Sequence, residues 1–586
     1  MDDDRGEHRS RRGVLAAAAA KADLRRSAAA ARRRVRLGRG SGGAERRRVF
    51  VVADDGPPDV LRAVIDRYRD DELFVVAPKP YDEWWLDGTR QRYLTLAKES
   101  NVHWFLKLHG PVDRIVDTRV RWPKEHEASL RKLLFHLAPD GEYVIPRSGF
   151  RAYGAGNPLE KRLVKFARAL SVGEPDDDFP ELSRAVAEVR LDREEIVVRK
   201  NGRHYLKLTD HWANRMITTR NDQTTTVREL TKLREQRFDS ATTVTSHGAS
   251  APLAGLETTV EVPPMHLRHY TGRIGLVSNA LTFSANEILP DSFRHHLSNR
   301  HNPRLIQVDK DFARIPQHVQ PTETLPGSYY MLDSENSGHY GHLMTEVISR
   351  LWGWDRAKAQ DPDLKAIIRL RFAAEREPDL ERSILRAYGI AEEDLVTIDH
   401  PVYLESMYGA TPMFHNARPY YVHPEIRAVW GRIRDGLITE QGATWDRVFV
   451  SRKDSLGNRR CLNRVDVEEF FAAAGFEVIY PEDYSLGRQA EIFANARVVA
   501  GFGGSAMFNA VFSEQLEHMI VLTQEAYTAR NEVLIALPLG IDMHYFWNTP
   551  TTAHPPGGWS EAAYKSDWSF DFSRHSGELE ALLRSF

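Results

Sequence analysis

The sequence predicts an α/β protein in which short strands alternate with helices, and three observations predict it. Near the C-terminus, short apolar runs alternate with segments of helical spacing, a pattern typical of βαβ units and parallel sheets. The same alternation occurs from Val49 onward. Between the two regions lies a stretch rich in Thr, Ser, Ala and Gly that ends at Pro263-Pro264, which indicates a domain boundary. We therefore expect a pair of Rossmann-like domains preceded by a further Rossmann-like α/β domain.

The composition limits the classes of protein. A chain of 586 residues is long enough for several domains. Its 80 Lys and Arg nearly balance its 82 Asp and Glu, so the charge gives no sign of a nucleic-acid partner. Cys461 is the only cysteine, which excludes an internal disulfide and fits a reducing compartment. No apolar run approaches the roughly 20 residues needed to span a bilayer, so we expect a cytoplasmic protein.

Residues 1–48 differ from the rest of the chain. They carry 15 Lys and Arg against 6 Asp and Glu, and we expect a basic, disordered tail. Ser10 to Leu15 resembles a twin-arginine export signal, but the apolar part that follows stops at Lys21, too early for such a signal. A further alternative is a tail attracted to anionic lipid headgroups, which would hold the protein peripherally at the inner face of the plasma membrane.

Residues 49–222 form the first expected domain. Its strands are predicted at 49–53, 73–77, 102–106, 114–116 and 142–145, and its helices at 59–68, 125–137, 157–170 and 181–189. Asn201-Gly202 lies between two apolar runs and predicts a β-hairpin, because this dipeptide supplies the positive φ that a two-residue turn needs. The stretch that follows, 223–264, is expected to be a linker.

Residues 265–441 form the first half of the expected pair, with strands predicted at 273–278, 280–290 and 329–333. The segment after the last strand has helical spacing and places His342 and Glu346 four residues apart, on one face. His339 lies one turn earlier. The order His-x-x-His-x-x-x-Glu differs from the His-Glu-x-x-His of zinc proteases. We therefore predict a polar face lining a cleft and no metal site.

Residues 442–586 form the second half. Strands are predicted at 447–451, 476–480 and 496–500, and helices at 466–474 and 486–494. After the last strand comes Gly501-Phe502-Gly503-Gly504-Ser505, followed by helix-compatible residues. Such a loop leaves backbone N–H groups free at the positive end of a helix dipole. Arg452 follows the first strand, at the edge where α/β sheets bind ligands, and its planar fork suits phosphate oxygens. Together they predict an anion site.

The stretch from His109 to Arg147 resembles the second half of class I S-adenosylmethionine methyltransferases, with a Gly-Pro-hydrophobic-Asp strand, a helix and an "hL.pGG.yv" strand. The glycine-rich cofactor loop of that family is missing, because Ala53-Asp54-Asp55-Gly56-Pro57-Pro58 follows the first strand. Glycines let the backbone approach the cofactor closely. We therefore expect a degenerate methyltransferase-like domain that does not bind S-adenosylmethionine.

Four blocks of residues between Met265 and about Trp547 resemble glycosyltransferase family 61, in its bacterial capsular-polysaccharide branch. His339 stands where asparagine is usual, Arg464 and Arg488 stand where acidic residues are usual, and Gly503 occupies the position of a histidine. The positions that match the blocks, in chain order, are His342, Glu346, Arg350 and Leu351; Arg452, Arg459, Arg460 and Asn463; Pro481, Glu482, Ser485 and Gln489; and Gly501, Gly504, Asn509 and Phe512.

The resemblance implies an inverting glycosyltransferase of GT-B-like architecture with a nucleotide-diphosphate sugar as co-substrate and no permanently bound cofactor. Residues 265–441 would present the acceptor, a saccharide or lipid-linked precursor of a cell-surface polysaccharide or glycolipid, and residues 442–586 would hold the donor nucleotide. The donor-binding residues it implies are Arg452, Arg460, Asn463, Glu482, Gln489, Gly503, Gly504, Ser505 and Asn509.

Inversion needs one displacement and one base that takes the acceptor hydroxyl proton. Histidine suits this task near neutral pH, so we assign it to His342, with Glu346 either orienting it or acting as the base. Two alternatives stay open. The departures at Gly503 and Arg464 favour a non-catalytic scaffold that binds a nucleotide sugar or a partner protein. A bifunctional methyltransferase–glycosyltransferase is the other, and the missing cofactor loop argues against it.

Overall fold

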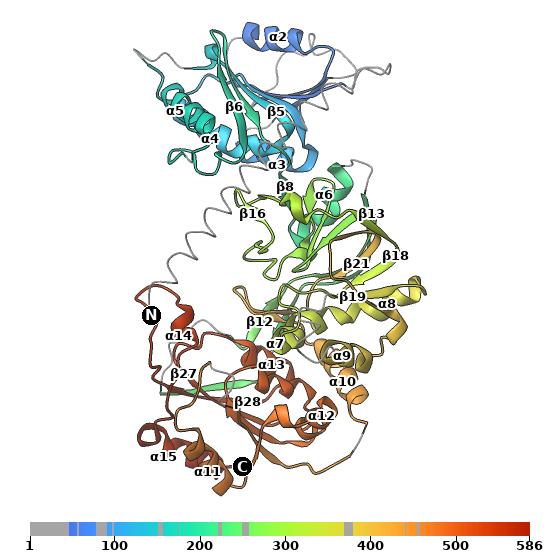
Figure 1. The fold of residues 1–586 in the computed structure, drawn as a ribbon, viewed down its shortest axis with the longest axis vertical. Helices are drawn as coiled ribbons and strands as arrows, with labels where there is room; N and C mark the ends of the chain where they lie inside the picture. Colours follow the sequence, from blue (N-terminus) through green and yellow to red (C-terminus); the bar gives the residue numbers. More distant parts are fainter. Residues whose placement is uncertain are drawn as a thin grey trace, which may run out of the picture.

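The computed structural model describes residues 46–54, 58–77, 91–95, 99–150, 156–174, 176–220, 225–248, 257–368, 379–439, 441–453 and 458–586. They form three bodies stacked along the long axis of the molecule (Figure 1). We call them the N-terminal body (46–200), the middle body (201–439) and the C-terminal body (441–586). The predicted basic tail lies outside the described residues up to residue 45. None of the described helices is long and apolar enough to cross a bilayer.

The N-terminal body is built on a sheet of seven described strands in the order β3-β2-β1-β4-β5-β7-β6. The first five are parallel, whereas β7 is antiparallel to both β5 and β6. The strands are β1 (Arg48–Val52), β2 (Glu72–Ala77), β3 (Gln91–Thr95), β4 (Val112–Asp117), β5 (Leu137–Pro146), β6 (Val186–Leu191) and β7 (Glu195–Lys200), and the helices are α2 (Pro58–Arg67), α3 (Glu99–His109), α4 (Pro123–Leu133), η2 (Leu134–His136), η3 (Arg147–Gly149) and α5 (Pro158–Val172).

The alternating direction of successive side chains along β1 explains the layers of this body. Val49 and Val51 point to one face, where they pack with Leu61 and Ile65 of α2. The next residues along the strand point to the other face, which α3, α4 and α5 cover. Hydrophobic side chains on both faces are what a parallel sheet buried between helices requires.

Three predictions for this part of the chain are wrong. Residues 102–106, predicted as a strand, lie in α3, because a short apolar run suits a buried helix as well as a strand. Residues 181–189, predicted as a helix, are turns that lead into β6. The Asn201-Gly202 hairpin does not form: β7 pairs within the N-terminal sheet, whereas β8 (Tyr205–Lys207) pairs with strands of the middle body. Gly202 still has a φ of 70°, but its turn connects two sheets.

The middle body is built on a mixed sheet of eleven described strands, in the order β16-β17-β8-β15-β14-β13-β21-β18-β19-β20, with β9 also paired to β13. Its strands β21-β18-β19-β20 are parallel to one another, and so is the short pair β8 and β15. The strands not yet bounded are β9 (Thr225–Leu233), β13 (Met265–Val277), β14 (Leu281–Ser284), β15 (Glu287–Ile288), β16 (Ile306–Gln307), β17 (Phe312–Arg314), β18 (Glu323–Met331), β19 (Lys365–Ile368), β20 (Leu395–Thr397) and β21 (Val402–Ala410).

The helices of the middle body lie mainly after β18 and β19. A hairpin of β22 (Phe414–His415) and β23 (Tyr421–Val422) precedes the last of them. The helices are η4 (Asp210–Trp212), α6 (Ala213–Arg220), η6 (Pro290–Ser292), η7 (Gln317–Val319), α7 (Tyr340–His342), η8 (Leu343–Val347), η9 (Ile348–Gly353), α8 (Trp354–Gln360), α9 (Asp379–Tyr388), η10 (Glu392–Asp394) and α10 (Ile426–Leu437).

The segment 223–264, predicted as a linker, instead contributes strands to both lower bodies. β9 pairs with β13 of the middle sheet, and β10 (Gln236–Asp239) pairs with β12 (Thr259–Val262). β11 (Thr243–His247) adds a parallel strand at the edge of the C-terminal sheet, beside β28 (Asp542–Asn548). Thr and Ser suit half-exposed strands as well as linkers, so composition alone pointed the wrong way.

The C-terminal body is built on six described parallel strands in the order β11-β28-β27-β26-β24-β25. Its own strands follow the doubly wound order 2-1-3-4-5, whose strand order reverses between the first and third, here β24 and β26. The elements are β24 (Arg447–Val450), α11 (Arg464–Ala473), β25 (Glu477–Ile479), η12 (Pro481–Asp483), α12 (Leu486–Asn495), β26 (Val498–Phe502), η13 (Ser505–Phe512), β27 (His518–Gln524), α13 (Asn531–Leu539), β28, α14 (Glu561–Tyr564) and α15 (Phe572–Leu583).

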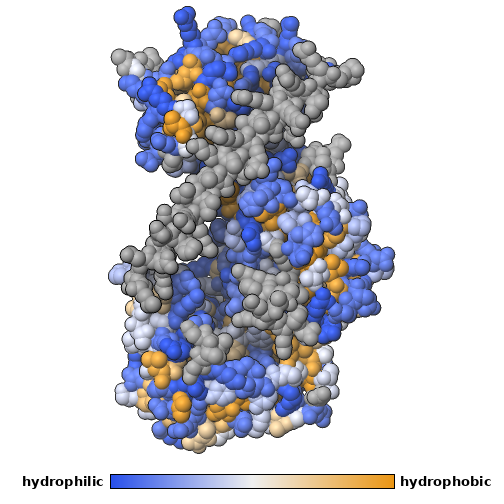
Figure 2. Space-filling view, viewed as in Figure 1, coloured by the Kyte–Doolittle hydropathy of each residue, from blue (hydrophilic) through white to orange (hydrophobic). Residues whose placement is uncertain are grey.

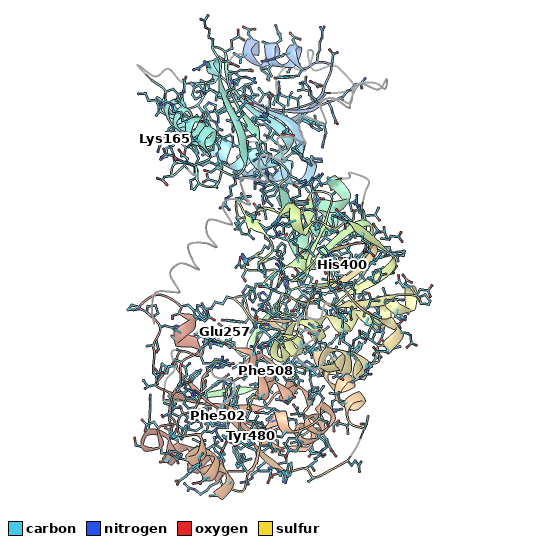
Figure 3. The ribbon with its side chains drawn as sticks, in the orientation of Figure 1. Lys165, Glu257, His400, Tyr480, Phe502 and Phe508 are labelled. Atoms are coloured by element: carbon cyan, nitrogen blue, oxygen red, sulfur yellow. The ribbon has the colours of Figure 1, made fainter. Side chains whose placement is uncertain are left out.

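The middle and C-terminal bodies share one hydrophobic core. Leu343 and Val347 of η8, Trp430 of α10, and Phe508 and Phe512 of η13 belong to a single buried cluster. Phe508 lies at the boundary between the two bodies (Figure 3). The α/β class is thus confirmed, with mixed sheets that are compatible with Rossmann-like glycosyltransferase folds. The GT-B-like arrangement stays a prediction.

Candidate active site

The predicted His342–Glu346 pair lies directly after the carboxyl end of β18. α7 covers only three residues there, and η8 is a turn of π-helix that carries Glu346. Single π turns are rare and occur often at functional sites. His342 Nδ1 lies 2.6 Å from Glu346 Oε1, so the predicted contact across four residues forms, on a helical segment that is less regular than expected.

Glu346 is held as an anion. Burial alone would raise its pKa, but the charges of Arg294 and His342 outweigh burial and lower the pKa to about 2. Arg294 Nε lies 2.5 Å from Glu346 Oε1, and the Ser334 hydroxyl donates to Glu346 Oε2 at 3.1 Å. An ionised carboxylate accepts a hydrogen bond from Nδ1–H of the imidazole, which leaves the lone pair of Nε2 available. Glu346 therefore orients His342.

Sequence reasoning missed three neighbours of this pair. Arg294 and His295 follow η6, and Glu335 lies in the loop after β18. Arg294, Glu335 and Glu346 line one cavity of about 20 Å³, room for about one water molecule. Burial raises the pKa of Glu335 and lowers the pKa of His295 to about 4. The only sequence signal was the run Arg294-His295-His296, an unusual cluster of basic side chains in a loop.

The second side of the site lies where the strand order of the C-terminal sheet reverses. Arg452 follows β24, and the Gly503–Ser505 loop follows the adjacent strand β26. Gly504 has a φ of 149°, and a Cβ placed on it would lie 3.3 Å from Arg459 Nη2 and 3.8 Å from Arg452 Nη1. Two guanidinium groups thus flank the loop at the position where doubly wound sheets bind ligands.

Neither guanidinium forms an ion pair within the described part of the chain. Arg452 is half-buried, and burial together with the charge of Arg459 lowers its pKa. Arg459 has a left-handed φ of 55°, and its buried Nε has no hydrogen-bond partner among the described residues. Partly buried cations repel each other unless an anion compensates them, so the charge of the pair suits an anionic ligand.

Aromatic rings hold Arg459 in place. Its guanidinium lies 4.9 Å from the ring centroid of Tyr527 and 5.2 Å from that of Tyr564, within the range of cation–π attraction. Arg459 matches a family block but is not among the predicted donor-binding residues. The sequence signal that could have indicated it is its position immediately before the predicted Arg460.

The backbone of the glycine loop is less available than predicted. Gly503 N–H donates to the Leu522 carbonyl at 2.9 Å, and Gly504 N–H donates to Glu532 Oε1 at 2.9 Å. The expectation of free amides is therefore wrong for these two residues. The histidine usual at position 503 would be tightly packed, since a Cβ there would lie 3.1 Å from Thr523 Oγ1 and 3.3 Å from the Tyr527 ring.

Four other predicted donor-binding side chains bond to the protein itself. Arg460 pairs with Asp567 at 2.6 Å, and Asn463 bonds both ways with the Phe570 backbone, at 3.0 and 2.8 Å. Gln489 accepts from Asn509 Nδ2 at 3.0 Å. Since each has hydrogen-bonding partners within the protein, these side chains support the walls of the site.

Glu482 takes a position closer to the prediction. It accepts from Lys453 N–H at 3.1 Å, directly beside Arg452. Arg464 and Arg488, which stand where the family carries acidic residues, pair with Glu468 and Glu491. Those two departures therefore belong to salt bridges on α11 and α12.

The two sides of the site meet. Tyr340 of α7 donates its hydroxyl proton to Asn509 Oδ1 of η13, and a Cβ placed on Gly341 would lie 3.1 Å from Ser505 Cβ. Burial raises the pKa of Tyr564. The charges of Arg459, from the C-terminal body, and Arg294, from the middle body, both oppose that rise, so both arginines lie near this tyrosine. Figure 2 shows a hydrophilic recess between the middle and C-terminal bodies. Histidine, carboxylate and arginine groups are thus gathered at one junction.

No group of three or more His, Cys, Asp or Glu side chains in the described ranges is arranged to hold a metal ion.

Comparisons with known proteins bear on part of the chain. Residues 340–520 match the family model Glycosyltransferase 61, a range that begins at α7 and includes Arg452 and the glycine loop. The match supports family 61 and a glycosyltransferase function. No curated protein matches the chain.

The chain is also similar to solved methyltransferases, at low identity. One is "MycE Methyltransferase from the Mycinamycin Biosynthetic Pathway in Complex with Mg, SAH, and Mycinamycin VI", at 16% identity over 27% of this chain and 45% of that chain, with a TM-score of 0.23. Another is the antibiotic-resistance methyltransferase Kmr, at 15% identity over 27% of this chain and 89% of that chain, with a TM-score of 0.19. The chain spans less than half of the length of MycE. At these TM-scores the likeness neither supports nor excludes methyl transfer.

Proposed function

We propose that this chain is an inverting glycosyltransferase that moves a sugar from a nucleotide-diphosphate sugar to a saccharide or lipid-linked acceptor, a precursor of a cell-surface polysaccharide or glycolipid such as a capsule. One observation carries the proposal: two arginines without a carboxylate partner among the described residues flank Gly504, across the junction from an oriented histidine. The family match over residues 340–520 supports the same class of reaction.

The chemistry follows from these groups. The acceptor hydroxyl oxygen forms a bond to the anomeric carbon as the bond from that carbon to the diphosphate oxygen breaks. Nε2 of His342 takes the hydroxyl proton, and ionised Glu346 stabilises the imidazolium that forms. Arg452 and Arg459 meet the charge that develops on the departing nucleoside diphosphate.

In this proposal fewer residues contact the donor than the sequence indicated. Arg452, Arg459 and Ser505 face the diphosphate, Gly504 keeps the loop open for it, and Glu482 is adjacent to accept from the ribose hydroxyls. Gly503 shapes the loop. Arg460, Asn463, Gln489 and Asn509 support the walls through their own partners.

The N-terminal body has a separate proposed role, in packing or in partner contact, without S-adenosylmethionine. The pairing of its buried charges near the ends of β1 and β4 supports this. Calorimetry that detected micromolar binding of S-adenosylmethionine would contradict it. The proposed membrane contact through the basic tail rests on composition alone, as does the cytoplasmic location.

Substitution of His342 tests the catalytic proposal. We expect His342→Ala to lower the rate of transfer by about 10²- to 10⁴-fold, the usual contribution of a general base, while nucleoside diphosphate binding is unchanged. Release of nucleoside diphosphate from candidate donors measures turnover, and calorimetry measures binding. Unchanged turnover would exclude His342 as the base.

A non-catalytic scaffold is the alternative that one observation favours. Glycine replaces the family's histidine at position 503, where a Cβ would lie within 3.1–3.3 Å of Thr523 and Tyr527. Such a scaffold would bind nucleotide sugars in a thermal-shift screen and would release no nucleoside diphosphate. The screen and the release assay together separate the two functions.

A further inference from the structure

The carboxyl edge of the C-terminal sheet carries more than the predicted anion site. All its strands are parallel, so the loops that follow them lie at one edge. Arg452 and Arg459 follow β24, the glycine loop follows β26, and Tyr527 follows β27. The segment after β28, residues 549–564, lies at the same edge and beyond the range that matches family 61.

Aromatic side chains continue from the anion site toward the solvent. The rings of Tyr527 and Tyr564, which both contact Arg459, have centroids 5.5 Å apart. The Trp559 ring follows, 6.0 Å from Tyr564. Trp559 is 62% exposed, so its indole surface is available to a ligand. The series thus leads from a cation at its buried end to an open aromatic surface.

Hydrogen bonds order the loop that carries this indole. Both nitrogens of His554 are used, since Nε2 lies 3.0 Å from the Ala526 carbonyl and Nδ1 accepts from Ser560 N–H at 3.1 Å. Gly558 N–H closes a turn on the Pro555 carbonyl at 3.1 Å. A loop that is already ordered loses little backbone entropy when a flat ligand stacks on its tryptophan.

We infer that Trp559 and Tyr564 form the wall on which the nucleobase of the donor stacks. This rests on the proposed function, because it takes the anion at Arg452 and Arg459 to be the diphosphate of a nucleotide. In such a molecule the base lies one ribose away from the phosphates, and Trp559 lies one ring beyond the tyrosine that contacts Arg459. Every nucleobase offers a π face, so the wall binds the base without selecting its identity.

The wall belongs to the donor rather than the acceptor. Its residues lie on the C-terminal body, beside the arginines, whereas His342 and Glu346 lie on the middle body. Stacking of a base on an aromatic side chain contributes about 1–3 kcal/mol. This corresponds to a change of about 5- to 160-fold in a dissociation constant.

Calorimetry on the full chain tests the inference. UDP, GDP, ADP, CDP and TDP are titrated into the wild type, and the tightest is compared with inorganic pyrophosphate, which has no base. We expect Trp559→Ala to weaken binding of the nucleoside diphosphate by about 5- to 160-fold and to leave pyrophosphate binding unchanged. Trp559→Phe should retain affinity within about threefold. Trp122→Ala is the matched control, an exposed tryptophan of the N-terminal body, and changes neither ligand.

The outcomes distinguish failure of the stacking wall from failure of the proposed function. If the wild type binds a nucleoside diphosphate and Trp559→Ala binds it equally well, the wall is excluded and the proposed function stands. If Trp559→Ala weakens pyrophosphate as much as the nucleotide, the residue supports the loop and the stacking role is excluded. If the wild type binds none of the five nucleotides, both the wall and the proposed function fail.

Discussion

The N-terminal and C-terminal bodies each present carboxyl ends of parallel strands at a point where strand order reverses, and they differ in what happens to the charges there. In the N-terminal body, Arg119 follows β4 and donates to both oxygens of buried Asp117, at 2.6 and 2.7 Å. Tyr143 donates to the same carboxylate at 2.8 Å. In the C-terminal body, Arg452 and Arg459 have no carboxylate partner among the described residues. The first edge pairs its charges within the protein, whereas the two guanidinium groups of the second form no ion pair among the described residues.

The two edges also differ in how their strands are joined. Thr118 N–H donates to the Val52 carbonyl at 2.9 Å, and Val120 N–H donates to Asp54 Oδ2 at 2.6 Å, so the ends of β1 and β4 are bonded to each other. At the C-terminal edge, Gly504 keeps space between two arginines. Similar sheet topology therefore leads to different binding capacity, because capacity depends on which polar groups remain without a partner.

The largest expected effect is on stability and belongs to the N-terminal edge. Arg119→Met leaves the carboxylate of Asp117 buried without its partner, and we expect the free energy of unfolding to fall by about 3–5 kcal/mol. Urea unfolding of the full chain measures it. The control is Arg190→Met, whose pair with Asp192 is about half exposed and contributes about 0–1 kcal/mol. Equal losses in the two variants would remove the distinction between the edges.

The matching change at the C-terminal edge should affect binding and not folding. We expect Arg452→Met and Arg459→Met each to weaken nucleoside diphosphate binding by about 10²-fold, since each removes a charged donor to phosphate, without lowering the free energy of unfolding. Arg460→Met distinguishes the structure-based assignment of donor-binding residues from the sequence-based one, because the Arg460 guanidinium already pairs with Asp567. We expect a change of less than about threefold there. A 10²-fold loss in Arg460→Met would restore the sequence-based assignment.

The contributions of the two edges to the free energy of unfolding should change in opposite directions with pH. Burial would raise the pKa of Asp117, but Arg119 outweighs it and lowers the pKa well below 3.8. The stability that this gives is present above pH 3.8 and is lost as the pH falls further. Burial raises the pKa of Glu532 above 4.5, so its contribution is present below pH 4.5 and is lost as the pH rises through the folded-state pKa.

Two variants measure how the free energy of unfolding changes with pH at each edge. The difference in unfolding free energy between wild type and Asp117→Asn should shrink as the pH falls from 4 toward 2. Between wild type and Glu532→Gln it should move in favour of the variant as the pH rises from 4 to 7. Parallel slopes for both variants would mean that the two carboxyl groups are in equivalent environments.

The smallest expected effect concerns the contact that only the C-terminal edge has. Tyr340 connects α7 to Asn509 of η13, and we expect Tyr340→Phe to lower the free energy of unfolding by about 1 kcal/mol. A double-mutant cycle with Asn509→Ala isolates the hydrogen bond. A coupling energy of zero would show that this hydrogen bond adds nothing to the contact between the two bodies.

Some features of the site could be predicted because they are local. The contact between His342 and Glu346 follows from helical spacing, and the positions of Arg452 and the glycine loop follow from the rule that parallel strands end at one edge. Arg294 could not be predicted to contact Glu346, since the two residues are far apart in the chain and only the folded sheet brings them together.

By itself, the sequence determined the α/β class, the polar pair on one helical face and the order of strands around the glycine loop, because these depend on periodicity and on neighbouring residues. Only the tertiary structure decided which charges are paired. Arg460 and Asn463 match the family blocks as well as Arg452 does, yet Asp567 and Phe570, about 100 residues later, bond to them. A long-range partner leaves no mark on the local pattern, so the availability of a side chain is a property of the fold.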